Sequence, residues 1–161
     1  MFCEIYFAFA NGYSGQTFFA DWLPMLYNAV WTSWPCMFTY FFERDADYDF
    51  SLKNPILYIA GHKKVYFNFR VFWKYILMAY IHGLICYLFP LLGFDDQIDD
   101  SGRTFDTWFH STLSFTLILH IVTYKLLVDS TMWNYINLTM CLISLVLYYV
   151  CVLIINMGFI A

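Results

Sequence analysis

Four long apolar stretches, separated by more polar segments, constrain this chain more than any other feature. They cover residues 22–42, 71–92, 107–128 and 133–155. As an α-helix the first stretch would be about 31 Å long at about 1.5 Å per residue, which matches the ~30 Å hydrocarbon core of a bilayer. A membrane-crossing strand needs only about 9–11 residues, so stretches of this length favour helices over a barrel. We predict an all-α, polytopic transmembrane helix bundle with four full spans, preceded by a helix stub at residues 1–10.

The composition also indicates a membrane protein. Hydrophobic residues make up 61% of the chain and charged residues 12%, whereas soluble domains average roughly 45–50% apolar and about 25% charged residues. The net charge of −4 is small and no basic patch with interleaved aromatic residues occurs, so nucleic-acid binding has no support. The five cysteines lie in apolar stretches without a C-x-x-C pair, which predicts buried thiols rather than a disulfide framework or a metal site. We predict a single domain over residues 1–161.

The distribution of basic residues predicts how the spans are oriented. With four spans, the loop over residues 43–70 and the turn over residues 129–132 must lie on the same side of the membrane. That side carries all but one of the eight lysines and arginines, namely Arg44, Lys53, Lys63, Lys64, Arg70, Lys74 and Lys125. The positive-inside rule therefore places these two segments in the cytosol, and residues 11–21 and 93–106 outside the cell or in a lumen. The sequence does not distinguish the plasma membrane from an endomembrane such as the Golgi.

Several other polar features are interpreted as structural. His82, inside the second span, is expected to form a packing hydrogen bond rather than a proton relay. The acidic segment 93–106 does not match the EF-hand spacing, so we prefer a solvated loop to a calcium site. The basic and aromatic residues over 63–70 are expected to flank a span at headgroup level, with contact to anionic lipid as the alternative.

The first span differs from the others because polar residues interrupt its apolar run. Asn28, Thr32 and Pro35 recur at steps of four and three residues, followed by Thr39 four residues later, which predicts that all four share one helical face. Amide and hydroxyl groups inside a membrane need partners within the protein, so this face, with the neighbouring Ser33, is expected to meet a bundle interior, a cavity or a substrate path. Pro35 has no N–H group and is expected to leave the Trp31 carbonyl oxygen free as an acceptor and to kink the helix. On this pattern alone, ordinary helix packing is favoured over a substrate path.

Several short sequence blocks follow one another around this span. Residues 11–16 form an Asn-Gly-Tyr-Ser-Gly-Gln turn, Asp21 and Trp22 enter the span, and the span contains Leu-Tyr-Asn at 26–28 and Thr-Ser-Trp-Pro at 32–35. After the span come Phe-Glu-Arg-Asp at 42–45, Pro55, Leu57, Tyr58 and Gly61, and then Phe67, Asn68, Phe72 and Trp73. In order and spacing these blocks resemble the C-terminal membrane region of the type IV P-type ATPases, the ATP-driven phospholipid flippases. Weaker similarity continues through Trp133, Asn137 and Ser144, so the resemblance covers nearly the whole chain.

This resemblance implies a function and a set of site residues. The chain would correspond to the end of the fifth helix through the ninth helix of a pump that moves phospholipid toward the cytosolic leaflet. Asn28, Thr32 and Ser33 would line a groove for the lipid headgroup, Pro35 would shape the local backbone, and the last three helices would form a scaffold. The partners implied are phospholipid, the bilayer, the remainder of the ATPase chain and, at the outward loops, a two-span accessory subunit.

The resemblance also indicates what to expect of the chemistry. The family is phosphorylated on the Asp of an Asp-Lys-Thr-Gly-Thr motif and uses ATP and Mg²⁺ in cytosolic domains, and no such motif occurs in this chain. We therefore assign no catalytic, cofactor-binding or metal-binding residue here, and we expect a fragment, truncated at both ends, that cannot hydrolyse ATP alone.

Two alternatives remain open from the sequence. The first is a free-standing four-span scaffold or assembly protein that derives from a flippase and lacks ATPase activity. The second is an unrelated channel or carrier, against which the spans contain no acidic residue and show no inverted repeat. The lipid transported, the membrane and the accessory subunit are not specified by the sequence.

Overall fold

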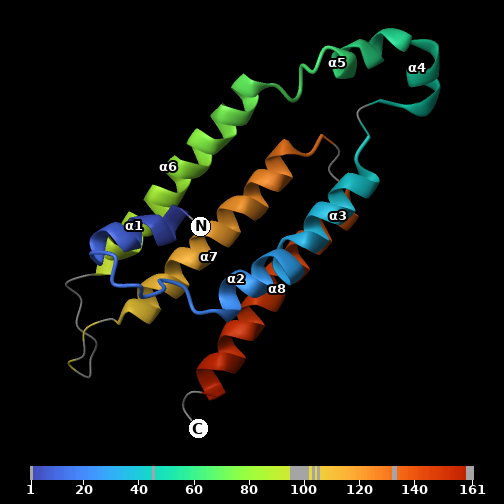
Figure 1. The fold of residues 1–161 in the computed structure, drawn as a ribbon. Coiled ribbons are helices and arrows are strands. Elements are labelled where there is room, and N and C mark those ends of the chain that lie inside the picture. Colours follow the sequence, from blue (N-terminus) through green and yellow to red (C-terminus); the bar gives the residue numbers. More distant parts are fainter. Residues whose placement is uncertain are drawn as a thin grey trace.

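The structure, a computed structural model, describes residues 2–44, 46–94, 102, 104, 106–131 and 134–158, and the elements in this part are helices (Figure 1). Three of them, α6 (Phe69–Phe94), α7 (Thr107–Asp129) and α8 (Tyr135–Gly158), are long and apolar enough to cross a membrane. They match the predicted second, third and fourth spans, although the predicted start of the fourth span at Trp133 lies outside the described residues. The predicted N-terminal stub is α1 (Phe2–Ala10). The all-α membrane bundle is thus confirmed.

The structure divides the predicted first span into three helical pieces. They are α2 (Trp22–Leu26), a π-helix η1 (Tyr27–Trp31) and α3 (Ser33–Phe42). The Thr32 N–H donates to the Tyr27 carbonyl oxygen, five residues back, at 3.1 Å. A turn of this kind holds more residues than an α-turn, so the residues before it are rotated relative to those after it. The prediction of one continuous polar face was therefore wrong: Pro35 and Thr39 are buried, whereas Asn28 is exposed.

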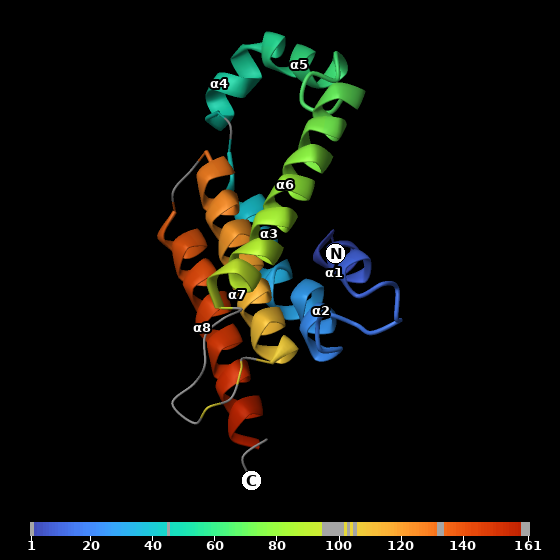
Figure 2. The ribbon, with the colours of Figure 1, turned by 90° about the vertical axis from the view of Figure 1, so that its left-hand side faces the viewer.

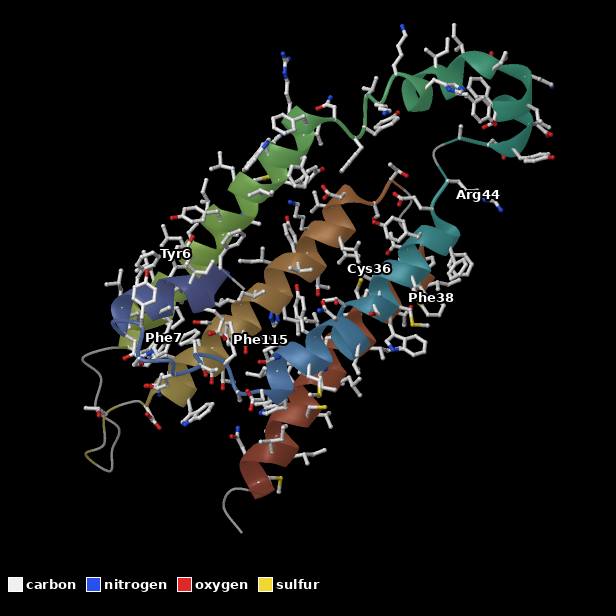
Figure 3. The ribbon with its side chains drawn as sticks, viewed as in Figure 1. Tyr6, Phe7, Cys36, Phe38, Arg44 and Phe115 are labelled. Atoms are coloured by element: carbon white, nitrogen blue, oxygen red, sulfur yellow. The ribbon has the colours of Figure 1, made fainter. Side chains whose placement is uncertain are left out.

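The helices form a bundle in which α7 lies centrally (Figures 1 and 2). α6 packs against α7 on one side and carries α1, while α3 runs along α8. Aromatic rings fill the middle of this arrangement: Trp31 is 0% exposed and meets Phe115 of α7 and Tyr148 of α8 edge to face, with ring centroids 5.6 and 5.1 Å apart. Figure 3 shows Phe115 pointing into the space between α7 and the first span. Burial of these rings joins the first span to the two C-terminal helices.

α1 and α6 approach each other most closely at Gly83. A Cβ atom at this position would lie 3.0 Å from the Cβ of Phe2, closer than side chains normally pack. The Cys3 thiol donates to the Gly83 carbonyl oxygen at 3.3 Å, and the Tyr6 hydroxyl donates to the Tyr80 carbonyl oxygen at 2.9 Å. A small residue at the crossing point lets two helix backbones come together, as is common in membranes.

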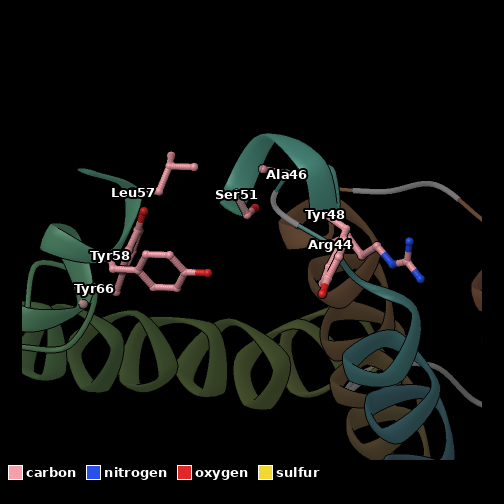
Figure 4. A pocket seen from close by; sticks show the side chains of 8 residues that line it. Arg44, Ala46, Tyr48, Ser51, Leu57, Tyr58 and Tyr66 are labelled. Atoms are coloured by element: carbon pink, nitrogen blue, oxygen red, sulfur yellow. The ribbon is translucent and has the colours of Figure 1, made fainter. Parts of the chain in front are cut away.

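The segment between α3 and α6 was expected to be a loop, and it contains three short helices. They are α4 (Tyr48–Lys53), a 3₁₀-helix η2 (Pro55–Tyr58) and α5 (Ile59–His62). Together they form an arch beyond one end of the bundle (Figure 1). An open cavity of about 880 Å³ lies in this arch, lined by residues that include Arg44, Tyr48, Tyr58 and Tyr66 (Figure 4).

Candidate functional site

The candidate site is the break in the first span, where hydroxyl groups bind main-chain carbonyls. The Thr32 hydroxyl donates to the Tyr27 carbonyl oxygen at 2.8 Å, the same oxygen that accepts from the Thr32 N–H. The Ser33 hydroxyl donates to the Asn28 carbonyl oxygen. Both hydroxyls therefore find their partners within the segment itself, which satisfies polar groups that have no water around them in a bilayer.

Pro35 has the effect on Trp31 that the sequence predicts. In a regular α-helix the N–H of residue 35 would donate to the carbonyl oxygen of residue 31, and proline has no such group. The Trp31 oxygen instead accepts a hydrogen bond from the Ser144 hydroxyl of α8. The free acceptor was predictable from the sequence, whereas its donor, 113 positions away, was not.

The four predicted groove residues do not form one continuous surface. Asn28 is exposed, Thr32 and Ser33 are half-buried, and Pro35 is buried. Beside them, an apolar groove of about 430 Å³ runs between the first span and α8, with Val30, Trp34 and Phe38 on one wall and Met140, Ile143, Ser144 and Leu147 on the other. The break thus leaves one amide exposed, and the residues that line the apolar groove do not include it.

Two glutamates hold the ends of the first span, and the contacts of neither were predicted from the sequence. The Glu4 carboxylate accepts the N–H groups of Phe18 and Phe19, each at 3.2 Å, and so fixes the turn that leads into α2. The Glu43 carboxylate accepts from the N–H of Thr131 at 2.8 Å and from its hydroxyl at 3.3 Å. An acidic side chain in an apolar helix needs partners, and this could have drawn attention to Glu4. The Glu43 contact brings the segments 43–70 and 129–132 to the same end of the bundle, as the number of spans requires.

A polar network joins α7 to α8 inside the predicted membrane region. The hydroxyl oxygens of Thr116 and Tyr148 are 2.6 Å apart, and the Tyr149 hydroxyl lies 3.2 Å from the Nε2 atom of His120. The Nδ1 atom of His120 is 2.8 Å from the Thr116 carbonyl oxygen, which can only accept. Nδ1 must therefore carry a proton and donate to this carbonyl, so the histidine has a structural role that links α7 to Tyr149 of α8.

The remaining polar candidates form no cluster of metal ligands among the residues that the structure describes. His82 and Lys125 line a cavity of about 240 Å³ between α1, η1, α6 and α7, in which the Lys125 ammonium lies 4.9 Å from the centre of the Tyr75 ring. In the part of the chain that the structure describes, no three His, Cys, Asp or Glu side chains are close enough to hold a metal ion. Most of the acidic segment considered as a calcium site, including Asp95, Asp96, Asp99 and Asp100, lies outside the described residues.

A helix bundle with three membrane-spanning helices, hydrogen bonds between the helices and a π-helix in a further apolar segment defines a polytopic membrane protein. Comparison with known families gives the particular class. Residues 1–161 match the family described as phospholipid-translocating P-type ATPase C-terminal, and the chain belongs to this family.

Curated relatives agree with this assignment. The chain is 28% identical over 148 residues to phospholipid-transporting ATPase IC of Homo sapiens, which covers 91% of this chain and 12% of that protein. It is 32% identical over 152 residues to phospholipid-transporting ATPase FetA of Mus musculus, covering 94% of this chain and 13% of the relative. A phospholipid-transporting ATPase of Schizosaccharomyces pombe is 28% identical over 132 residues, or 81% of this chain and 10% of its own length. The chain therefore spans roughly one eighth of the length of these relatives.

Proposed function

We propose that this chain is the membrane portion of an ATP-driven phospholipid translocase that moves phospholipid toward the cytosolic leaflet. The observation that carries the proposal is the break in the first span, which places the Asn28 amide on the surface of an apolar segment long enough to cross a bilayer. Polar groups in such a position are costly and mark sites of function in membrane proteins, and π-turns often occur at functional sites. The names of the relatives support phospholipid as the substrate class.

The residues of the break suggest how a headgroup would be accommodated. A charged or zwitterionic headgroup cannot cross hydrocarbon without polar contacts to replace water, and interrupted helices supply such contacts in transporters. The exposed Asn28 side chain offers donors and an acceptor. Thr32 and Ser33 use their protons on main-chain carbonyls but keep acceptor capacity, and Pro35 maintains the irregular backbone. α6, α7 and α8 would serve as the scaffold that holds this segment in place.

ATP and Mg²⁺ would act elsewhere in the pump. We assign no residue of this chain to either, because the Asp-Lys-Thr-Gly-Thr motif on which the family is phosphorylated does not occur in it. The bound nucleotide supplies the phosphoryl group that drives the transport cycle. The role of this chain is to convert the resulting movement into passage of a lipid.

The orientation of the chain is part of the proposal. Residues 43–70 and 129–132 would lie in the cytosol and residues 11–21 and 93–106 outside it, where a two-span accessory subunit would dock. The excess of basic residues and the Glu43–Thr131 contact at the same end support this orientation. Accessibility of single cysteines, introduced at Ser51 and at Thr17 in a cysteine-free background, to a membrane-impermeant reagent tests it. Labelling of position 51 in intact, right-side-out cells would contradict it.

Transport by the full-length protein that carries this segment tests the central proposal. In vesicles, Asn28→Ala is expected to lower the rate of phospholipid translocation about tenfold, because the exposed amide is lost from the path of the headgroup. Met25→Ala is the matched control, since Met25 is also exposed, lies three residues earlier and is apolar. Equal rates for Asn28→Ala and the parent protein would contradict the role of Asn28.

The size of the native polypeptide separates the translocase from the free-standing scaffold. An immunoblot of source membranes, probed with an antibody against residues 46–64, is expected to show a band several times larger than 19.2 kDa. A band at 19.2 kDa would instead exclude ATP-driven transport by this chain and favour the scaffold.

A further inference from the structure

We infer that Ser144 of α8 is a positioning residue for the proposed headgroup groove. Its hydroxyl, through the Trp31 carbonyl, holds the π-turn that determines where Asn28 points. The inference rests on the proposed function, because the groove belongs to that proposal. In this scheme Ser144 acts through the Trp31 carbonyl and does not contact the lipid. The scaffold helix α8 would then directly influence the geometry of the π-turn in the first span.

The first step of the argument is the unusual acceptor that Ser144 serves. The Trp31 carbonyl has lost its α-helical donor to Pro35, and Trp31 is 0% exposed. A buried carbonyl without a donor destabilises a folded protein, and no water is available to replace the donor in a bilayer. Serines inside helices commonly donate to a carbonyl of their own helix. Ser144, only 4% exposed, donates instead to the neighbouring segment.

The second step is the position of this acceptor at the end of the π-turn. Trp31 is the last residue of η1, and the Thr32 N–H closes the turn by donating to Tyr27. The hydroxyls of Thr32 and Ser33 stabilise the turn from within the segment. Ser144 supplies the hydrogen bond that anchors it to another helix. An α-turn contains one residue fewer than a π-turn. If the turn took α-helical geometry, residues 22–31 would therefore rotate by about 100° relative to α3. Asn28 would then face a different direction.

The third step is that α8 contacts Trp31 at two points on the same face. Ser144 and Tyr148 are four residues apart, which places them one above the other on α8. Ser144 binds the Trp31 carbonyl, and the Tyr148 ring packs at right angles to the Trp31 ring, with an interplanar angle of 88°. Because ring packing fixes the side chain and the hydroxyl fixes the main chain, the two contacts together determine the orientation of this residue.

The test uses the full-length pump in phosphatidylcholine vesicles that contain fluorescent phosphatidylserine as the transported probe. Ser144→Ala is expected to raise the half-saturating probe concentration about three- to tenfold, with a smaller change in maximal rate, because Asn28 is displaced from its orientation. Ser144→Thr, which keeps the hydroxyl, is expected to remain within twofold of the parent. Ser114→Ala is the matched control: Ser114 of α7 is 0% exposed, but its hydroxyl has no partner among the described residues.

A double substitution with Pro35→Ala shows whether Ser144 acts through the Trp31 carbonyl. Alanine at position 35 supplies the N–H that proline lacks, so the carbonyl no longer needs Ser144. Adding Ser144→Ala to Pro35→Ala should therefore change the half-saturating concentration by less than twofold. A full effect of Ser144→Ala in the Pro35→Ala background would overturn the inference, as would an effect in the parent background no larger than that of Ser114→Ala.

Failure of the proposed function gives a different result. If the parent pump transports neither phosphatidylserine nor fluorescent phosphatidylcholine, the translocase proposal fails and the positioning role falls with it. Thermal unfolding of the same variants would still report the hydrogen bond, because Ser144→Ala should lower the melting temperature only where Pro35 is present. An active parent in which Ser144→Ala behaves like Ser114→Ala overturns the positioning role alone.

Discussion

Two prolines in this bundle occupy similar positions and have different effects. Pro35 lies in the first span and Pro90 lies in α6, and both are buried. The first span is divided by a π-turn that ends four residues before Pro35, whereas α6 continues as an α-helix from Phe69 to Phe94 through Pro90. Proline alone therefore does not account for the break.

The neighbours of the two prolines explain the difference. Thr32 and Ser33 precede Pro35, and their hydroxyls bind the Tyr27 and Asn28 carbonyls that the irregular backbone presents. Pro90 is flanked by leucine and phenylalanine over residues 88–92, which have no side-chain donors. A membrane helix can depart from α-geometry only where other groups satisfy its main chain. The break thus depends on hydroxyls near the proline, including one from α8.

The largest effect is expected where the broken span meets the rest of the bundle. Trp31→Ala would leave a cavity among Trp22, Phe115 and Tyr148, at a cost of about 3–5 kcal/mol in the free energy of unfolding. Trp73→Ala in α6 removes the same side chain from an exposed position and should cost less than about 1 kcal/mol. Unfolding of the detergent-solubilised protein, followed by circular dichroism, measures both. Similar losses of unfolding free energy for the two variants would show that the packing of Trp31 against α7 and α8 is no more important to the fold than an exposed tryptophan.

A smaller loss is expected from the turn that leads into the broken span. Glu4→Ala removes the acceptor of two N–H groups, and hydrogen bonds to charged groups contribute about 1.5–3 kcal/mol each in favourable cases. Because Glu4 is only half-buried, we expect a total loss of about 2 kcal/mol by the same unfolding measurement. Glu4→Gln keeps one acceptor oxygen and should lose less than half of this. Equal losses for the two variants would mean that charge, and not hydrogen bonding, holds the turn.

The hydrogen bond between the continuous helices α7 and α8 should contribute still less to the free energy of unfolding. Tyr148→Phe removes the hydroxyl that lies 2.6 Å from that of Thr116, and interhelical hydrogen bonds in membranes average about 0.6 kcal/mol, with a maximum of about 1.7 kcal/mol. We expect a loss in this range by thermal unfolding. Tyr124→Phe, at an exposed position of α7, is the control and should have no measurable effect. A loss well above this range would show that the polar network organises α7 and α8 more strongly than ring packing does.

Pro90→Ala should have the smallest effect and tests the comparison directly. The substitution restores a donor for the Cys86 carbonyl and removes part of a buried ring, and these contributions oppose each other. The free energy of unfolding should therefore stay within about 1 kcal/mol of the parent value, and the translocation rate should not change. A pronounced loss of transport on Pro90→Ala would show that α6 also needs a local irregularity.

The sequence predicts features of this fold that depend on one segment at a time. Apolar stretches of sufficient length predict α6, α7 and α8, and the missing N–H of Pro35 predicts a free Trp31 acceptor. The shared face of Asn28, Pro35 and Thr39 was not correctly predicted, because a π-turn changes the spacing and nothing in the local pattern signals it. The donors Ser144 and Thr131 depend on which helices become neighbours, and this is decided by packing across the whole bundle.

The close approach at Gly83 has a mechanical consequence for the start of the chain. With no side chain on Gly83, the backbones of α1 and α6 come close there, and the hydrogen bonds of Cys3 and Tyr6 tie the two helices together beside this crossing. A movement of α6 would therefore carry α1 and Glu4 with it, and Glu4 binds the main-chain N–H groups of Phe18 and Phe19. A displacement of α6 would thus be passed on through α1 and Glu4 to the turn that enters the broken span.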